Sequence, residues 1–167
     1  KALIEIMRGE GKGVLGFVPD MSIFQNHPHE PWIQEALNEG CRKEVLDAML
    51  EKHVTQRPRE EILAGDLSKI EQFYGAQLIE DYDGATQVEQ LRELMDCVFY
   101  MHGKFYYIND NLEEIAIPYQ EILTMVKDSG YEGYIACEYE GHHFDTQISA
   151  VDQLDRYVAM CDHILGK

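Results

Sequence analysis

Three short apolar runs in this chain each end in a side chain that can ionise or bind a metal. The runs end at Asp20, His102 and Glu138. Barrels of alternating strands and helices build their active sites from residues at the C-terminal ends of parallel strands. Carboxylate and imidazole groups are also common ligands of divalent cations. The pattern therefore predicts parallel strands that bring a metal site together at one edge of a sheet.

Strand-like and helix-like segments alternate along the chain, which predicts β-α-β units and an α/β fold. Strands are expected at residues 13–19, 97–107 and 133–139. Helices are expected at residues 32–53 with a break at Gly40, and at residues 67–74, 86–96, 118–130 and 147–165. Residues 75–84 are expected to form a loop. In the last helix, the residues that share an apolar face and are predicted to be buried are Ile148, Val151, Leu154, Val158 and Ile164.

Three strands are too few for a closed barrel of eight. We therefore interpret the fold as the C-terminal part of a (β/α)8 TIM barrel, with residues 1–167 in one domain. Residues 26–85 are far longer than one crossover requires and are predicted to form a helical insertion. The N-terminal half of the barrel is expected to come from an earlier part of a longer polypeptide or from another chain.

The composition excludes some functions and leaves others open. The 167 residues carry a formal net charge of -17, which would repel a phosphate backbone and argues against nucleic-acid binding. No apolar stretch approaches the roughly 20 residues that span a bilayer, so no membrane association is expected. The four cysteines are widely spaced without a CxxC pair, which favours a reducing, cytoplasmic location.

The densest polar cluster follows the third predicted strand, in the sequence Glu-Tyr-Glu-Gly-His-His. In a strand, Glu138 and Glu140 point to the same side. One of them could bind a metal while the other acts as an acid or base, because a cation or a raised pKa relieves the repulsion between two carboxylates. The candidate catalytic residues are Glu138, Glu140 and His142. A solvated loop beyond the strand is the alternative interpretation.

Three further residues are candidates for substrate binding. Lys104 lies two residues beyond His102, so both side chains point the same way if the strand continues. Its ammonium could bind an anionic or hydroxylated substrate, or could pair with one of the many acidic residues. His143 could contact substrate or lie on the surface, and His27 could reach a ligand or belong to a flexible loop after Asp20.

The order and spacing of these motifs resemble the C-terminal half of the xylose isomerase-like barrels, the sugar isomerase and epimerase superfamily. The resemblance rests on the Pro19-Asp20 strand end, on residues 101–105 (Met-His-Gly-Lys-Phe) and on residues 130–141 with their glycines and aromatics before Glu138. It implies that Asp20, His102 and Glu138 bind one divalent ion, Mn²⁺ in the first place, with Mg²⁺, Co²⁺ or Zn²⁺ as alternatives. A fourth ligand, a glutamate, would lie on an earlier strand. The implied chemistry is proton transfer beside a sugar carbonyl.

The long 26–85 segment departs from simple epimerases. Together with the His-Gly-Lys-Phe-Tyr strand, it resembles the larger, metal-bearing subunit of bacterial C-glycoside deglycosidases. Those barrels pair with a small β-rich subunit and eliminate an aglycone from a 3-oxo sugar, a reaction that also starts from an acidic proton beside a ketone.

Three functional hypotheses follow. The first is a metal-dependent isomerase or epimerase that acts on a sugar or keto-sugar through an enediolate. The second is a lyase subunit that cleaves C-glycosides together with a small β-rich subunit. The third is a non-catalytic barrel fragment whose acids and histidines are structural. A homo-oligomer is expected, because part of a barrel must bury its open edges.

Overall fold

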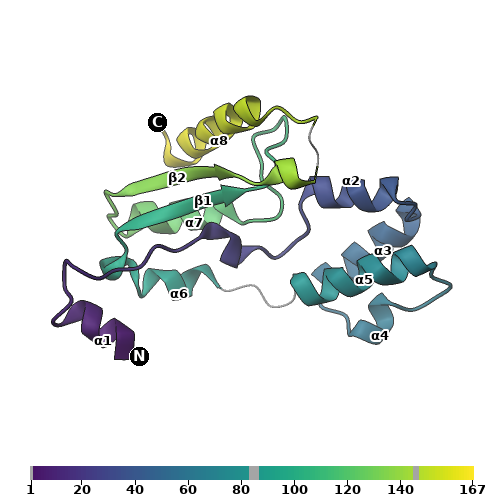
Figure 1. The fold of residues 1–167 in the computed structure, drawn as a ribbon, viewed down its shortest axis with the longest axis horizontal. Coiled ribbons are helices and arrows are strands. Elements are labelled where there is room, and N and C mark those ends of the chain that lie inside the picture. Colours follow the sequence, from purple (N-terminus) through teal and green to yellow (C-terminus); the bar gives the residue numbers. More distant parts are fainter. Residues whose placement is uncertain (1, 83–86, 145–146) are drawn as a thin grey trace.

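A pair of parallel strands forms the centre of the protein (Figure 1). The computed structural model describes residues 2–82, 87–144 and 147–167. Strand β1 (Tyr100–Phe105) pairs with β2 (Tyr134–Tyr139), with His102 opposite Ala136 and Lys104 opposite Glu138. Helix α7 connects the two strands, as a parallel connection requires. The predicted α/β class is therefore confirmed, and two of the three predicted strands lie where the sequence placed them.

The helical elements occupy most of the remaining described chain. In chain order they are α1 (Ala2–Arg8), η1 (Met21–Phe24), α2 (Glu30–Asn38), α3 (Lys43–Val54), α4 (Arg59–Ile62), α5 (Lys69–Asp81), α6 (Val88–Arg92), η2 (Met95–Cys97), α7 (Tyr119–Asp128), η3 (Gly141–His143) and α8 (Ala150–Leu165). The break at Gly40 is confirmed between α2 and α3, where this glycine has a φ of 105°. Residue 86, where the 86–96 helix was expected to begin, lies outside the described residues.

The segment predicted as a first strand runs beside β1 but forms no regular strand. Two isolated parallel bridges join it to the chain around β1, Phe17 to Val98 and Asp20 to His102. The amide of His102 donates to the carbonyl of Pro19 at 2.9 Å. Since proline has no N–H to return a ladder hydrogen bond, the pairing is interrupted there. The prediction of a regular strand over residues 13–19 was therefore wrong, although this segment does lie next to β1.

One face of the sheet is packed against helices and the other carries the polar residues. Met101 and Phe105 are fully buried in the main apolar core together with residues of α7 and α8. Phe105 stacks on Tyr157 of α8 with 4.7 Å between ring centroids. On the opposite face the side chain of Tyr134 is 81% exposed. Parallel sheets are usually covered on both faces. The described chain therefore covers only half of this sheet.

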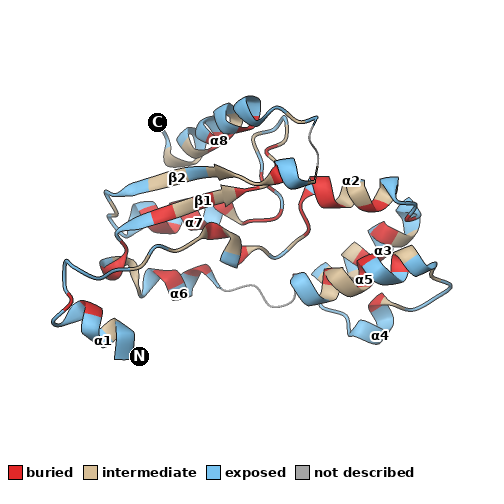
Figure 2. Ribbon diagram, in the orientation of Figure 1, coloured by how far each residue is buried: buried red, intermediate tan, exposed pale blue. Residues whose placement is uncertain are grey.

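Helix α8 presents a different face to the core from the one predicted. Val151, Leu154 and Val158 are exposed, Gln153 and Tyr157 are buried, and Ile164 of the predicted face packs partly buried against the core. Much of the surface of α8 is exposed (Figure 2). The side chain of Gln153 bonds the backbone of Ile108 in both directions, accepting at 2.6 Å and donating at 3.2 Å. A polar anchor and an aromatic stack thus set the rotation of the helix. No helix among the described residues combines the length and apolar character needed to cross a membrane.

Helices α2 to α5 pack around an apolar core of their own, separate from the core beneath the sheet. Helix α5 continues to Asp81, so the loop prediction is wrong for residues 75–81, while residues 83 and 84 lie outside the described residues. The reason is a close helix contact: a Cβ on Gly75 would meet the side chains of Leu63 and Met49. This glycine therefore allows helices to approach and does not break the helix.

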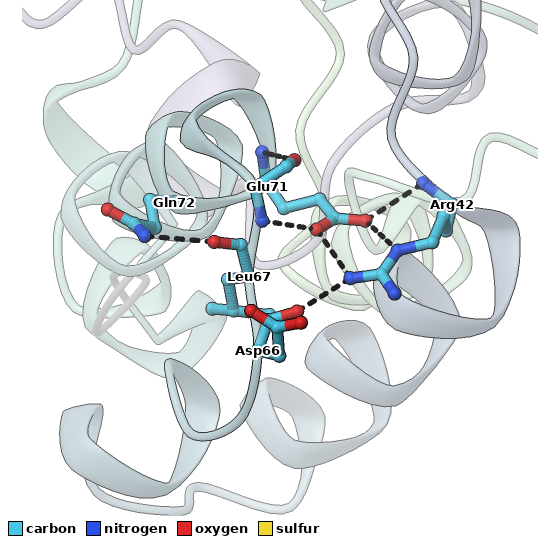
Figure 3. A network of polar contacts seen from close by, with 6 residues as sticks. Arg42, Asp66, Leu67, Glu71 and Gln72 are labelled. Atoms are coloured by element: carbon cyan, nitrogen blue, oxygen red, sulfur yellow. Dashed lines mark hydrogen bonds and ion pairs between the residues drawn. The ribbon is translucent and has the colours of Figure 1, made fainter.

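An ion pair between a buried glutamate and a half-exposed arginine fixes the start of α5 to the start of α3 (Figure 3). The carboxylate of Glu71, which is 1% exposed, accepts hydrogen bonds from the Nε and the backbone N–H of Arg42 at 2.7 and 3.1 Å. It also accepts from the backbone N–H of Ser68 at 2.7 Å, which completes a capping box. The Arg42 guanidinium, followed by the Ser68 N–H, holds the pKa of Glu71 well below its usual range.

Glu71→Gln is expected to destabilise the helical segment at neutral pH. The lowered pKa means that the carboxylate stabilises the fold above its unfolded pKa of 4.5 and that this contribution is lost as the pH falls. The difference between wild type and variant should therefore be large at pH 7 and shrink at pH 3. Asp47→Asn, which removes an exposed pair with Lys43, is the matched control. Urea unfolding followed by circular dichroism would contradict the assignment if both variants lost equal unfolding free energy at pH 7.

Candidate active site

The pairing of the strands brings the predicted site residues together on the open face of the sheet. His102 and Lys104 lie two residues apart on the same face of β1, and Glu138 lies opposite Lys104 on β2. Asp20 forms a parallel bridge to His102 from the neighbouring segment. The spacing of two residues in a strand accounts for the shared side of His102 and Lys104. Residues 118 positions apart in the sequence, Asp20 and Glu138, therefore belong to one cluster.

The ammonium of Lys104 lies between three carboxylates. Its Nζ is 3.1 Å from Asp20 and 3.7 Å from both Glu138 and Glu140. Burial alone would lower the pKa of Lys104, but the neighbouring carboxylates, Asp20 first, outweigh burial and raise it. Lys104 is therefore a fixed cation at neutral pH and not a base. The ion pairs that were one alternative for Lys104 are present, and its contact with a substrate stays a prediction.

Asp20 has both a local and a long-range role. Its Oδ1 accepts a hydrogen bond from the Ser22 N–H at 2.9 Å and caps η1. Burial by itself raises the pKa of this carboxyl, but Ser22 and then Lys104 hold the pKa below its usual value. Asp20 is therefore ionised, as both a cap and a metal ligand require.

His102 and Glu138 contact each other directly. The ring Nδ1 of His102 is 2.7 Å from Oε2 of Glu138, across the two strands. A carboxylate in this position orients the imidazole and favours the tautomer with a proton on Nδ1, which leaves Nε2 as an acceptor or ligand.

Glu140 and the two following histidines lie just beyond the end of β2. Glu140 Oε2 is 3.4 Å from Nε2 of His143, which is 61% exposed. The rings of His142 and His143 lie 4.1 Å apart, and His142 also lies 5.9 Å from the ring of Tyr139. His143 therefore joins the edge of the cluster through Glu140, while the ring of His142 makes tilted contacts with His143 and Tyr139 at the surface.

His27 lies in a different part of the molecule. Its Nδ1 is 2.7 Å from the carbonyl oxygen of Pro28, and its side chain lines a separate cleft together with residues of the helical segment. The structure shows no contact between His27 and the described residues of the strand-end cluster, so substrate binding by His27 stays a prediction.

The donor types at the strand ends suit a divalent ion, but they do not form a ligand shell in this structure. Asp20, His102 and Glu138 supply two carboxylates and an imidazole, a set that Mn²⁺ or Mg²⁺ accepts. Among the residues that the structure describes, no three or more His, Cys, Asp or Glu side chains are arranged to hold an ion. The Lys104 ammonium instead balances the carboxylates. The metal therefore stays a prediction.

A buried histidine next to the cluster was not recognised as structural from the sequence. His29 is 1% exposed, and its Nδ1 accepts a hydrogen bond from the Trp32 N–H at 3.1 Å to cap α2. Its ring stacks on Tyr106, with 4.2 Å between centroids, just beyond β1. Burial lowers the pKa of His29 to about 4, so the ring is neutral. A histidine directly before Glu-Pro-Trp was the available signal of a helix cap.

A second buried group holds the loop that follows β1. Glu114 is 9% exposed, and its Oε2 accepts hydrogen bonds from the backbone N–H groups of Ala116 and Ile117. Burial raises the pKa of Glu114 to about 7, although these donors favour the ionised form. No residue pattern singled out Glu114, because its burial depends on how the loop packs.

Similarity to known proteins points in one direction. No protein-family model matches the chain. It is 28% identical over 163 residues to a 3'-dehydrocarminate deglycosidase alpha subunit of Microbacterium sp, covering 87% of this chain and 47% of that protein. C-glycoside deglycosidase alpha subunits of Microbacterium trichothecenolyticum and Arthrobacter globiformis are 33% and 36% identical over 69 and 62 residues, or 41% and 37% of this chain. The chain spans about half the length of the first relative and less than a fifth of the other two.

These relatives are named as subunits of enzymes that act on glycosides. Their names agree with the hypothesis of a C-glycoside-cleaving subunit better than with the isomerase hypothesis.

Glu114→Gln is expected to remove part of the pH dependence of stability. A carboxyl whose pKa rises on folding stabilises the fold below its unfolded pKa of 4.5, and this contribution is lost as the pH rises through about 7. Between pH 4.5 and 8 the unfolding free energy of the wild type should fall by up to roughly 3 kcal/mol more than that of the amide variant. Urea unfolding at several pH values tests this, with the exposed neighbour in Glu113→Gln as control. Parallel pH profiles for wild type and Glu114→Gln would refute it.

Proposed function

We propose that this chain forms part of the alpha subunit of a C-glycoside deglycosidase, a lyase that cleaves the bond between a 3-oxo sugar and its aglycone. The observation that carries the proposal is the cluster of Asp20, His102, Glu138 and Glu140 around the Lys104 ammonium. The names of the similar proteins support the choice of substrate class.

The proposed reaction begins with loss of the proton on C2, beside the C3 ketone. The C–H electron pair becomes part of an enolate. When the C3 ketone re-forms, a C1=C2 double bond forms and the bond from C1 to the aglycone carbon breaks. The electron pair of that bond leaves with the aglycone carbon, which then takes up a proton. We assign the base to Glu140, because Glu138 is engaged by His102 at 2.7 Å. The fixed positive charge of Lys104 stabilises negative charge that develops on the ketone oxygen.

His142 and His143 stand at the exposed end of the cluster, and we propose that they contact the substrate. His142 is the candidate proton donor to the departing aglycone carbon. His143, paired with Glu140 at 3.4 Å, positions the base.

We further propose that Asp20, His102 and Glu138 hold one divalent ion, with Mn²⁺ as the first candidate. When bound, the ion would act as a Lewis acid toward the ketone oxygen. The fold proposed for the complete protein is a TIM barrel in which residues 26–85 are a helical insertion. The N-terminal half would cover the open face of the sheet and supply a fourth ligand, and a small β-rich subunit is the proposed partner.

Glu140→Gln should lower kcat for aglycone release by on the order of 10³, because the amide cannot accept the C2 proton. The assay is chromatography of the aglycone released from the 3-oxo form of an aromatic C-glucoside, with the protein and the chains that co-purify with it. Glu132→Gln, at an exposed glutamate before β2, should stay within about twofold of wild type. Epimerisation of a free ketose without aglycone release would favour the isomerase hypothesis instead.

Metal content separates the enzymatic hypotheses from a non-catalytic fragment. We expect about one Mn²⁺ per chain by elemental analysis, and its loss in Glu138→Gln. Lys104→Met should strengthen Mn²⁺ binding by roughly tenfold, because it removes a like charge beside the proposed ligands. The exposed Lys43→Met is the control. If the wild type retains no metal and is insensitive to chelation, the metal assignment fails.

A further inference from the structure

A second cleft lies away from the strand-end cluster, between the helical segment and the loops. It is lined by His27 from the loop after Asp20, by Tyr82 after α5, by Ile115, and by residues 53, 54 and 56–59, which run from the end of α3 to the start of α4. Its volume is about 880 Å³, compared with about 500 and 450 Å³ for two other cavities among the described residues. This is the size range of cavities that bind small organic molecules.

The charge of this cleft is opposite to that of the whole chain. The sequence has 31 acidic and 14 basic residues, yet the described lining contains Arg57 and Arg59 and no aspartate or glutamate. His27 and His53 add two imidazoles to the same wall. A concentration of guanidinium groups in a concave site attracts and orients anions.

The two arginines are available to a ligand. Each has one acidic neighbour outside the cleft lining: Glu61 lies 4.0 Å from Arg57, and Glu80 lies 3.4 Å from Arg59. All four side chains are about half exposed or more. Exposed pairs of this kind contribute little to stability, so a ligand carboxylate can replace the protein carboxylate at low cost. A guanidinium binds a carboxylate through two parallel hydrogen bonds.

The rest of the lining mixes polar and apolar side chains. Asn26, Gln56 and Gln87 contribute amides. Ile62 and Tyr82 are buried, while Val54 and Ile115 expose large parts of their side chains and present an apolar surface beside the arginines. The cleft therefore combines a site for a negative group with a surface for a flat hydrophobic body.

We propose that this cleft binds an aromatic carboxylate, with the carboxylate between Arg57 and Arg59 and the ring against Ile115 and Tyr82. The site is separate from the catalytic cluster, so the proposal does not depend on the proposed lyase activity. It also assigns His27 to ligand binding in this cleft and not at the strand ends.

Isothermal titration calorimetry with 1-naphthoate and 1-naphthamide tests the proposal on the protein with its co-purifying chains. The wild type should bind the carboxylate at least about tenfold more tightly than the amide. The double variant Arg57→Gln/Arg59→Gln should lose that preference. Arg92→Gln, at an arginine with an exposed Glu89 partner outside the cleft, should keep it.

A second variant tests the position of the ligand without changing the arginines. Ile115→Glu places a carboxylate in the lining of the cleft and should weaken naphthoate binding more than naphthamide binding. The proposal is overturned if the wild type shows no saturable binding, if the double variant behaves like Arg92→Gln, or if Lys104→Gln abolishes naphthoate binding while the double variant does not. The last result would place the anion at the strand ends.

Discussion

The parallel pairing of β1 with β2 is the constraint on which the rest of the structure depends. Its register sets Lys104 opposite Glu138 and turns Met101 and Phe105 toward the helices. Because side chains alternate along a strand, a slip of one residue would bury the ionisable groups and expose the apolar ones. The stack of Phe105 on Tyr157 resists that slip. The same interaction that builds the core therefore builds the candidate active site.

The strand-end cluster concentrates charge that needs compensation. Asp20, Glu138 and Glu140 would repel one another on an acidic protein, and Lys104 offsets this from within the cluster. The carboxylates, Asp20 first, raise the pKa of Lys104, and Lys104 adds to the effect of the Ser22 N–H in lowering the pKa of Asp20. In the proposed enzyme the same arrangement would accept a metal ion as a further cation and would stabilise an enolate. The same four side chains, Asp20, Lys104, Glu138 and Glu140, therefore balance charge in the fold and take part in the proposed reaction.

Buried polar groups hold the segments around this cluster in place. Glu114 ties the loop after β1 through backbone N–H groups, and His29 caps α2 while its ring stacks on Tyr106. Glu71 joins α5 to α3 through Arg42. Each group satisfies backbone or side-chain donors that would otherwise be unpaired in the interior, where such losses cost most. The cleft with Arg57 and Arg59 lies between the segments that these groups position.

The sequence by itself determined the strands β1 and β2, the α/β class, the helix end at Gly130, and the grouping of Asp20, His102 and Glu138. These follow from local periodicity, from glycine conformation and from the alternation of side chains in strands. Only the tertiary structure decided that α8 buries Gln153 and Tyr157, that α5 continues through Gly75, and that His27 lines a separate cleft. Those outcomes depend on contacts between distant segments, such as Gln153 with Ile108 and Gly75 with Met49. Burial and pairing across the fold, as at Glu114, set pKa values that no local pattern encodes.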